Sequence, residues 1–384
     1  MTGLYIHIPF CVRKCLYCDF YSLPTGKGPL SQRLADVRME HQPGFLEALE
    51  IEVRQFTPNF QPETIFIGGG TPTELSDDDF RELFRLIHRR IDVSCVKEWT
   101  CESNPGTLTE SKVDIMVDGG VNRVSLGVQS LTPSVLEFIG RIHSPDEALA
   151  GYRLLREKGV RNINLDFMYG IPGQNLVDLE RDLKTAVDLA PEHLACYCLI
   201  FEDGTPLTEL RDKGYLKEVD SDIELTQYDL VQATMAAAGY RHYEISNFAR
   251  PGFECAHNLL YWSGGEYLGC GPSAHSHWQG TRWGNIRNLE AYNRNLGAGR
   301  SIRQFEECLS GEAKARETLV MYLRRIDGVS RDEFRQATGY ALDDLCGPTL
   351  RWLTEIKMLD DRNGRIQLTR QGLFVSDSVF AELV

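Results

Sequence analysis

Short β-rich runs alternate with amphipathic helical patterns over the first 200 residues, and this alternation most constrains the fold. Several of the runs are nearly continuous in apolar residues, as expected for parallel strands that are covered on both faces. Six strand–helix units in series predict an α/β fold with a parallel sheet, either open or rolled into a barrel. The predicted strands are LYIHIPF (4–10), ETIFIGG (63–69), EWTCESN (98–104), RVSLGVQ (123–129), NINLDFMYG (162–170) and HLACYCLI (193–200).

The helices between these strands begin at capping signals. Ser76 precedes three aspartates and an apolar stripe, which is typical of a helix start. Ser144 is followed by Pro145 and Glu147, the pattern of a capping box with proline in the first turn. Strands and helices therefore both carry clear local signals.

The pattern changes twice after the last strand–helix unit, so we predict three parts. Residues 1–239 form the β/α part. Residues 240–311, rich in Gly, Asn and aromatic side chains, form a linking α+β segment. Residues 312–384 resemble a small winged-helix-like domain, with helical patterns followed by an Asn363-Gly364 turn. Its acidic residues outnumber its basic ones, so we expect a structural or lid role rather than nucleic-acid binding.

Composition limits the class of protein. A hydrophobic content of 42% and a charged content of 25% are those of a soluble globular chain. No apolar run approaches the roughly 18 residues of a membrane span, and no signal peptide is visible, so we expect a cytoplasmic location. The net charge of −14 disfavours a broad nucleic-acid interface. The eleven cysteines, an odd number, favour reduced thiols over a disulfide framework.

Three of these cysteines, Cys11, Cys15 and Cys18, follow the first predicted strand with the spacing CxxxCxxC. Structural zinc normally has four protein ligands, often as two separated pairs, and no second CxxC pair exists here. An iron–sulfur cluster also normally takes four cysteines, so three would leave one iron open to another ligand. An accidental group of thiols is the third interpretation. The spacing favours a metal centre.

Other polar signals stand at the ends of the predicted strands, where α/β proteins bind their ligands. The second strand ends in GGGTPT (68–73), whose glycines let backbone N–H groups approach a ligand. Glu102, Gln129 and Asp166 lie near the ends of three later strands. We therefore expect one binding site at this edge of the sheet.

The cysteine motif, with an aromatic residue before its last cysteine, resembles that of the radical S-adenosylmethionine (SAM) superfamily. In that family three thiolates hold a [4Fe-4S] cluster, SAM chelates the fourth iron, and an electron from a donor splits SAM to give a 5′-deoxyadenosyl radical. The resemblance implies a partial (β/α)6 barrel with Cys11, Cys15 and Cys18 as cluster ligands. It further implies a SAM site made of Tyr5, Tyr17, Gly69, Gly70, Thr71, Glu102, Gln129, Arg141 and Asp166.

The resemblance extends to a narrower group. The motifs YIHIPFC, GGGTPT, ESNPGTLT, RVSLGVQS, IGRIH, INLDFMYGIPGQ, FEDGTPL, YEISNFA and HNLLYW run in order along residues 5–262. They are similar to those of the oxygen-independent coproporphyrinogen III oxidase group and, within it, of the HemW-type haem chaperones. The oxidases carry a further cysteine two positions after the third, where this chain has Phe20, and a longer segment ahead of the motif. Phe20 therefore argues against the oxidase.

The motif HNLLYW is associated with haem in the chaperone branch, which implies a haem site. An imidazole can bind haem iron and aromatic rings can stack on the macrocycle, although a histidine among aromatics often only packs. The implied residues are His257, Asn258, Tyr261 and Trp262. Rival ligands are Cys255, His275 and His277, and Arg282 and Arg287 are candidate partners of the propionates.

The leading hypothesis is a haem chaperone that delivers haem to an acceptor protein such as a respiratory haem enzyme. The first alternative is oxidative decarboxylation of two propionates of coproporphyrinogen III. A radical SAM enzyme with an unrelated substrate and a zinc protein are the others. The sequence assigns no catalytic residue. A membrane-bound acceptor would bring peripheral contact with a membrane, although no amphipathic anchor is visible.

Overall fold

The computed structural model describes residues 1–26, 44–56 and 60–384. Its main element is a twelve-stranded sheet with the order β14-β13-β12-β11-β1-β4-β5-β6-β7-β8-β10-β9. Within it, six strands stand side by side in chain order and are all parallel. They are β1 (Thr2–Ile8), β4 (Thr64–Gly69), β5 (Glu98–Ser103), β6 (Arg123–Gln129), β7 (Asn162–Tyr169) and β8 (His193–Cys198). The predicted α/β fold, a partial (β/α)6 barrel, is confirmed.

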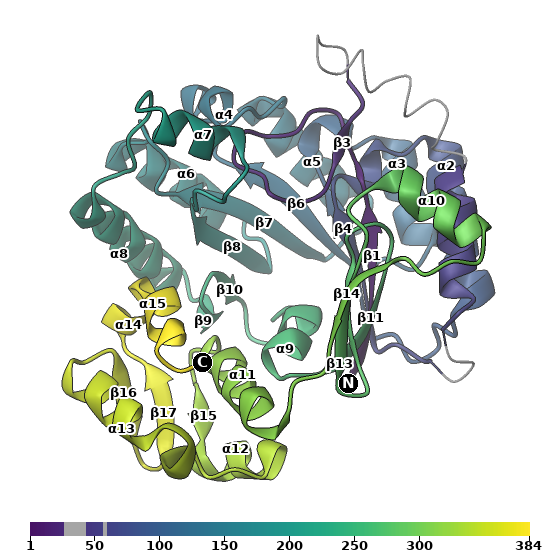
Figure 1. Cartoon of the computed structure of the whole chain (residues 1–384). Helices are drawn as coiled ribbons and strands as arrows, with labels where there is room; N and C mark the ends of the chain where they lie inside the picture. The colour runs from purple at the N-terminus through teal and green to yellow at the C-terminus, as the bar shows by residue number, and fades with distance from the viewer. Residues whose placement is uncertain (27–43, 57–59) are drawn as a thin grey trace.

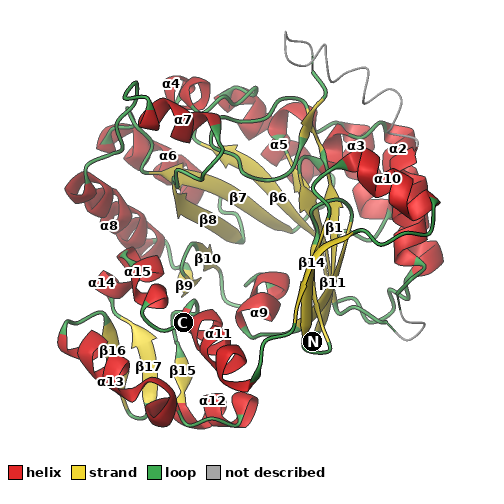
Figure 2. Cartoon of the chain, viewed as in Figure 1, coloured by secondary structure: helices red, strands yellow, loops and turns green. Residues whose placement is uncertain are grey.

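Helices cover the outside of this parallel sheet (Figures 1 and 2). Each buries one apolar face, as α2 does with Phe80, Leu83 and Ile87. The covering helices are α2 (Asp77–Arg90), α3 (Glu110–Asp118), α5 (Pro145–Glu157), α6 (Leu176–Asp188) and α8 (Ser221–Ala237). Two shorter helices, α4 (Pro133–Phe138) and α7 (Pro206–Asp212), follow β6 and β8. In the part of the chain that the structure describes, no helix has the length and apolar character that crossing a membrane requires.

Residues 240–311 extend the sheet at both of its edges. The strands β9 (Arg241–Glu244) and β10 (Asn247–Ala249) continue it antiparallel beyond β8. On the other side β11 (Glu266–Cys270) pairs parallel with β1. An antiparallel meander follows, made of β12 (His275–Trp278), β13 (Thr281–Asn285) and β14 (Arg303–Glu307). The segment also contains the short helices α9 (Ala256–Trp262) and α10 (Leu289–Gly297).

The C-terminal residues form five helices and a small sheet around their own hydrophobic cluster. The strands pair antiparallel in the order β15-β17-β16, and the turn between the last two has Asn363 and Gly364 at positive φ. This is the expected winged-helix-like arrangement. Its elements are α11 (Gly311–Leu323), β15 (Val329–Ser330), α12 (Arg331–Thr338), α13 (Leu342–Glu355), β16 (Leu359–Arg362) and β17 (Arg365–Leu368), followed by α14 (Arg370–Phe374) and α15 (Ser376–Ala381).

The C-terminal domain packs against the open side of the barrel, with α11 next to α9 (Figure 1). Backbone hydrogen bonds join the two parts, because Ile245 N–H donates to the Arg324 carbonyl at 3.2 Å and Ile326 N–H to the Tyr243 carbonyl at 3.1 Å. The guanidinium of Arg324 also lies over the Trp262 ring, 4.4 Å from its centroid. These contacts bring α11 to the space beside the barrel.

The capping box of α5 offers a test of local stability. Ser144 Oγ accepts from Glu147 N–H at 3.3 Å, and Glu147 Oε2 accepts from Ser144 N–H at 2.7 Å. Replacement Ser144→Ala should lower the free energy of unfolding by about 1 kcal/mol. Ser310→Ala is the matched control, because Ser310 is the N-cap of α11 and makes no side-chain cap bond. Equal losses in chemical denaturation would contradict the assignment.

Candidate functional site

A cavity of about 570 Å³ opens at the carboxyl ends of the parallel strands. We call it the cysteine cavity. Eleven of the twelve residues predicted for the cluster and SAM line it: Cys11, Cys15, Tyr17, Cys18, Gly69, Gly70, Thr71, Glu102, Gln129, Arg141 and Asp166. The twelfth, Tyr5, lies elsewhere, with its hydroxyl 3.0 Å from His7 Nδ1. The fold thus brings residues as far apart in the sequence as Cys11 and Asp166, 155 positions, into one cavity at the strand ends, as predicted.

The loop that carries the cysteines is fixed by backbone hydrogen bonds. At its base β2 (Phe10–Cys11) pairs with β3 (Leu23–Pro24). Gly70 N–H donates to the Ile8 carbonyl at 2.8 Å, and Thr71 N–H donates to the Phe10 carbonyl at 2.6 Å. A Cβ on Gly70 would lie 2.5 Å from the Phe10 carbonyl oxygen. Glycine is required because the two backbones approach so closely.

The three thiols fit an iron–sulfur cluster. Burial raises the pKa of Cys11, and burial together with nearby Cys15 raises the pKa of Cys18 to about 12. The thiolate forms of Cys11 and Cys18 therefore need a positive partner, which the iron of a cluster would provide. The described residues contain no group of three or more His, Cys, Asp or Glu converging on one metal ion. A cubane cluster does not need one, because each thiolate binds a different iron.

Glu102 and Asp166 form an acidic pair in the same cavity. Burial, and then the charge of Asp166, raise the pKa of Glu102 to about 8. Burial likewise raises the pKa of Asp166, although its carboxylate accepts hydrogen bonds from Asn164 Nδ2 at 2.6 Å and Ser125 Oγ at 3.2 Å. Such a pair favours a ligand that is cationic and carries hydroxyl groups. SAM has both features.

Arg141 and Gln129 also line the cysteine cavity. Arg141 donates to the Gly127 carbonyl at 2.5 Å and lies 3.6 Å from Cys15 Sγ, but its buried Nε has no hydrogen-bond partner. An unpaired buried donor at a cavity wall is consistent with a bound ligand. Gln129 has a φ of 67°, and its Oε1 accepts from Tyr197 O–H at 2.6 Å.

The cysteine cavity is also lined by residues that were not predicted from the sequence, among them Arg123, Ser125, Asn164 and Tyr197. The spacing of two of these residues along their strands could have indicated them. Ser125 stands two positions before Gly127, and Asn164 two positions before Asp166, so each shares the cavity face of its strand. Polar residues at that spacing inside otherwise apolar strands mark the face that meets a ligand.

The motif HNLLYW forms α9. Glu98 caps this helix, because its carboxylate accepts from Ala256 N–H and His257 N–H, each at 3.0 Å. His257 is only 1% exposed. Its Nδ1 is hydrogen-bonded to Thr64 Oγ1 and its Nε2 to the Tyr261 hydroxyl, both at 2.8 Å. Two of the other residues predicted for haem, Asn258 and Trp262, line the cysteine cavity.

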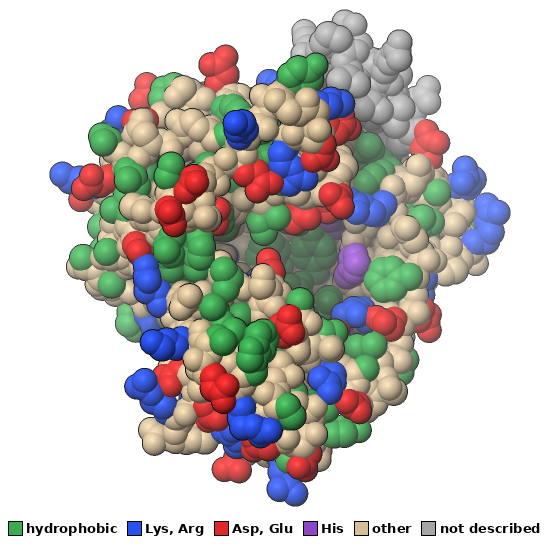
Figure 3. Space-filling model, turned by 60° about the vertical axis from the view of Figure 1, so that its left-hand side comes forward, with side chains coloured by type: hydrophobic (Ala, Val, Ile, Leu, Met, Phe, Trp, Pro, Cys, Tyr) green, Lys and Arg blue, Asp and Glu red, His purple; other side chains and the backbone are tan. Residues whose placement is uncertain are grey.

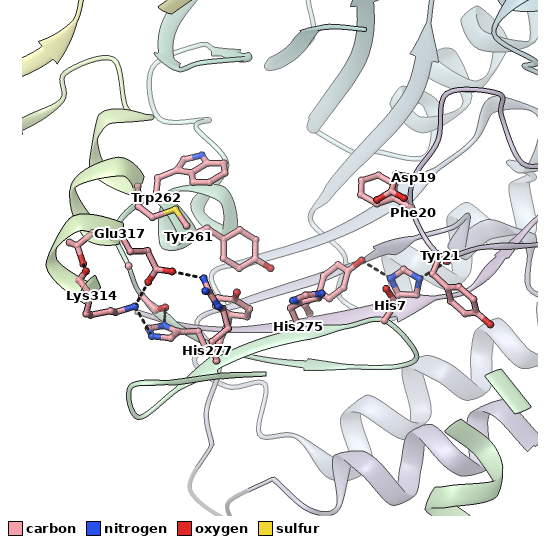
Figure 4. Close-up of a pocket in the computed structure, with 18 of the residues that line it drawn as sticks. His7, Asp19, Phe20, Tyr21, Tyr261, Trp262, His275, His277, Lys314 and Glu317 are labelled. Carbon is pink, nitrogen blue, oxygen red and sulfur yellow. Dashed lines mark hydrogen bonds and ion pairs between the residues drawn. The ribbon is translucent and has the colours of Figure 1, made fainter. Parts of the chain in front are cut away.

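A second cavity of about 450 Å³ lies beside the first, between the edge strands β11–β13 and helix α11. We call it the histidine cavity. Its aromatic and histidine side chains include Tyr5, His7, Tyr21, Tyr261, Tyr267, His275 and His277 (Figure 4). Asp19, Phe20 and Trp262 line both cavities. Figure 3 shows the surface hollowed between the barrel and the C-terminal domain, with hydrophobic side chains inside and a histidine at the rim.

The barrel and its cysteine cavity define a radical SAM protein, and comparison with known proteins confirms this class. Residues 5–186 match the radical SAM superfamily, and residues 309–375 match the HemN C-terminal domain. Among solved structures, the coproporphyrinogen III oxidase HemN from Escherichia coli superposes with a TM-score of 0.82. That match covers 100% of this chain and 89% of HemN at 22% identity, so it establishes the fold alone.

Proteins of similar sequence show to which family within the radical SAM superfamily this chain belongs. The heme chaperone HemW of Bacillus subtilis (strain 168) is 37% identical over 99% of this chain and 98% of its own length. The protein of that name in Mycobacterium tuberculosis (strain H37Rv) is 33% identical over 100% and 94%. The one in Escherichia coli (strain K12) is 39% identical over 71% and 69%. The chain therefore belongs to the HemW family.

The close approach at Gly70 predicts how the cluster loop fails. Replacement Gly70→Ala should reduce the iron and sulfide bound after anaerobic reconstitution, because the added Cβ would displace the backbone of Ile8 or Phe10. Gly106→Ala is the control, since the nearest atom to its Cβ would be 3.6 Å away. Unchanged iron content in Gly70→Ala, at wild-type solubility, would contradict the assigned role of the glycine turn.

The raised pKa of Glu102 predicts a pH dependence of SAM binding. A cationic ligand prefers the ionised carboxylate, and below about pH 8 the free protein must first lose a proton. Affinity should therefore rise with pH up to about 8 and then level off. Isothermal titration of the cluster-loaded protein between pH 6.5 and 8.5 measures this. Glu102→Gln should bind more weakly and lack this rise, and an identical profile in the two proteins would contradict it.

Proposed function

We propose that this protein is a haem chaperone, which binds haem and a SAM-coordinated [4Fe-4S] cluster and delivers haem to acceptor proteins such as respiratory haem enzymes. The observation that carries the proposal is the aromatic, histidine-containing cavity beside the cysteine cavity. Whole-length similarity to proteins named heme chaperone HemW supports it. Haem iron takes a protein side chain such as histidine as its ligand, and this cavity offers histidines among aromatic rings.

The [4Fe-4S] cluster and SAM would both bind in the cysteine cavity. Cys11, Cys15 and Cys18 would hold the cluster, with Arg141 close to the thiolate of Cys15. The glycine turn and the acidic pair would hold SAM. When bound, the cluster and SAM supply one-electron chemistry, which requires an electron donor as a partner. The chain's own residues orient SAM, neutralise its charge and exclude water from it.

The second candidate function is oxygen-independent oxidation of coproporphyrinogen III, and the likeness in fold to HemN favours it. Phe20 weighs against it. It stands where the resemblance to the oxidases would require a further cysteine, and its side chain is 64% exposed between the two cavities. A phenyl ring there offers a porphyrin an apolar surface and no thiol.

Parallel assays distinguish the two functions. The anaerobically reconstituted protein is titrated with haem, and the same preparation is incubated with coproporphyrinogen III, SAM and a reductant. We expect one haem bound per chain and no decarboxylated product. Decarboxylation without specific haem uptake would establish the oxidase instead. HemN, assayed alongside, shows that the conditions support decarboxylation.

A further inference from the structure

We propose that haem occupies the histidine cavity and that His275, outside the HNLLYW motif, is its axial ligand. This inference rests on the proposed function and assigns the site that the function requires. The cavity volume of about 450 Å³ lies within the range of small-molecule sites. In the view of Figure 4, His275 lies across the cavity from Trp262 and Phe20.

Availability of a nitrogen lone pair selects His275 over its neighbours. His7 is hydrogen-bonded at Nδ1 to the Tyr5 hydroxyl and at Nε2 to the Tyr21 carbonyl, at 3.0 and 2.8 Å. His277 is 3.1 Å from the Gly265 carbonyl at Nδ1 and 3.1 Å from Lys314 Nζ at Nε2. Each of these rings would have to give up a hydrogen bond before it could bind iron.

His257 is even less available, because it is buried, lines neither cavity and has both ring nitrogens hydrogen-bonded. The ring of His275, by contrast, has no hydrogen-bond partner among the described residues, and its side chain is exposed. Although the side chain is exposed, partial desolvation at the cavity wall and then the charges of Arg282 and Arg287 lower its pKa, which favours the neutral imidazole with a free lone pair. Within the histidine cavity, His275 is therefore the ring that can bind iron at the lowest cost.

The walls of the cavity suit a flat, apolar macrocycle. Phe20 and Trp262 stand between this cavity and the cysteine cavity, and Tyr5, Tyr267 and Met321 add further apolar surface. Aromatic side chains that gather at one cavity and remain partly exposed to it are typical of a binding site. A porphyrin bound here would cover the exposed ring of Phe20, which also lines the cavity assigned to SAM.

The charges at the rim indicate which residue meets the propionates. Arg282 is paired with Glu307 and Glu317, and Lys314 is paired with Glu317 at 2.7 Å. Arg287 is half exposed, donates one hydrogen bond to the Asp19 backbone carbonyl at 2.8 Å, and lies 3.4 Å from its nearest carboxylate oxygen, on Asp19. Arg287 is therefore less tightly paired with carboxylates than Arg282 or Lys314, and its guanidinium suits a propionate.

The test is haem titration of the full-length, cluster-reconstituted protein, followed by visible spectroscopy and by electron paramagnetic resonance of the ferric haem. His275→Ala should lose the histidine-ligated spectrum and bind haem about tenfold more weakly or worse. Added imidazole should restore the spectrum, since it replaces the missing ligand. The control His257→Gln, with a wild-type circular dichroism spectrum, should keep the wild-type haem spectrum. Arg287→Ala should weaken binding without altering the axial ligand.

The outcomes separate the inference from the proposed function. One haem per wild-type chain with an unchanged spectrum in His275→Ala would overturn the inference and leave the chaperone function standing. Loss of the spectrum in His257→Gln but not in His275→Ala would also overturn it, in favour of the motif histidine. Failure of the wild type to bind haem would overturn both.

Discussion

The position of β1 in the middle of the sheet determines where both cavities lie. It pairs parallel with β4 on one side and with β11 on the other, so three strands end at the same edge. Neighbouring strands are only about 4.8 Å apart, and the connections that leave them must pass one another closely. Gly70 meets the backbone of Phe10, and a Cβ on Gly271, which has a φ of 100°, would lie 2.4 Å from the His7 carbonyl oxygen. The cysteine loop therefore has a cavity on each side.

The two cavities have different chemistry, although they share a wall. The cysteine cavity gathers thiols and carboxyl groups whose pKa values are raised, so it is poised for iron and for a cationic ligand. The histidine cavity is lined by aromatic rings and imidazoles, and Arg282, Arg287 and Lys314 also line it. Phe20 and Trp262 separate them, and Arg324 of the C-terminal domain packs on Trp262. The C-terminal domain thus contributes to the histidine cavity through α11 and to the shared wall through Arg324.

The sequence predicted the parts of this structure that depend on local signals. The six parallel strands end within two residues of their predicted limits, and the capping box at Ser144 is present. The rule that ligands bind at strand ends located the cysteine cavity. The rest depends on pairings between distant residues. The strands β11 to β13 are short and polar, and nothing local shows that β11 pairs with β1. Likewise, the partner of His257 Nδ1 is Thr64, 193 positions away, so the motif alone could not show that this ring is occupied. The limits of the three predicted domains stay a prediction.

The central claim is that one chain holds its cluster and its haem in two adjoining cavities. Iron anomalous diffraction from crystals of the cluster-reconstituted, haem-loaded protein tests it most directly. The account predicts two separate iron positions, one enclosed by Cys11, Cys15 and Cys18 and one within coordination distance of the His275 imidazole. A second iron position beside His257, or on the outer surface away from Phe20 and Trp262, would contradict it.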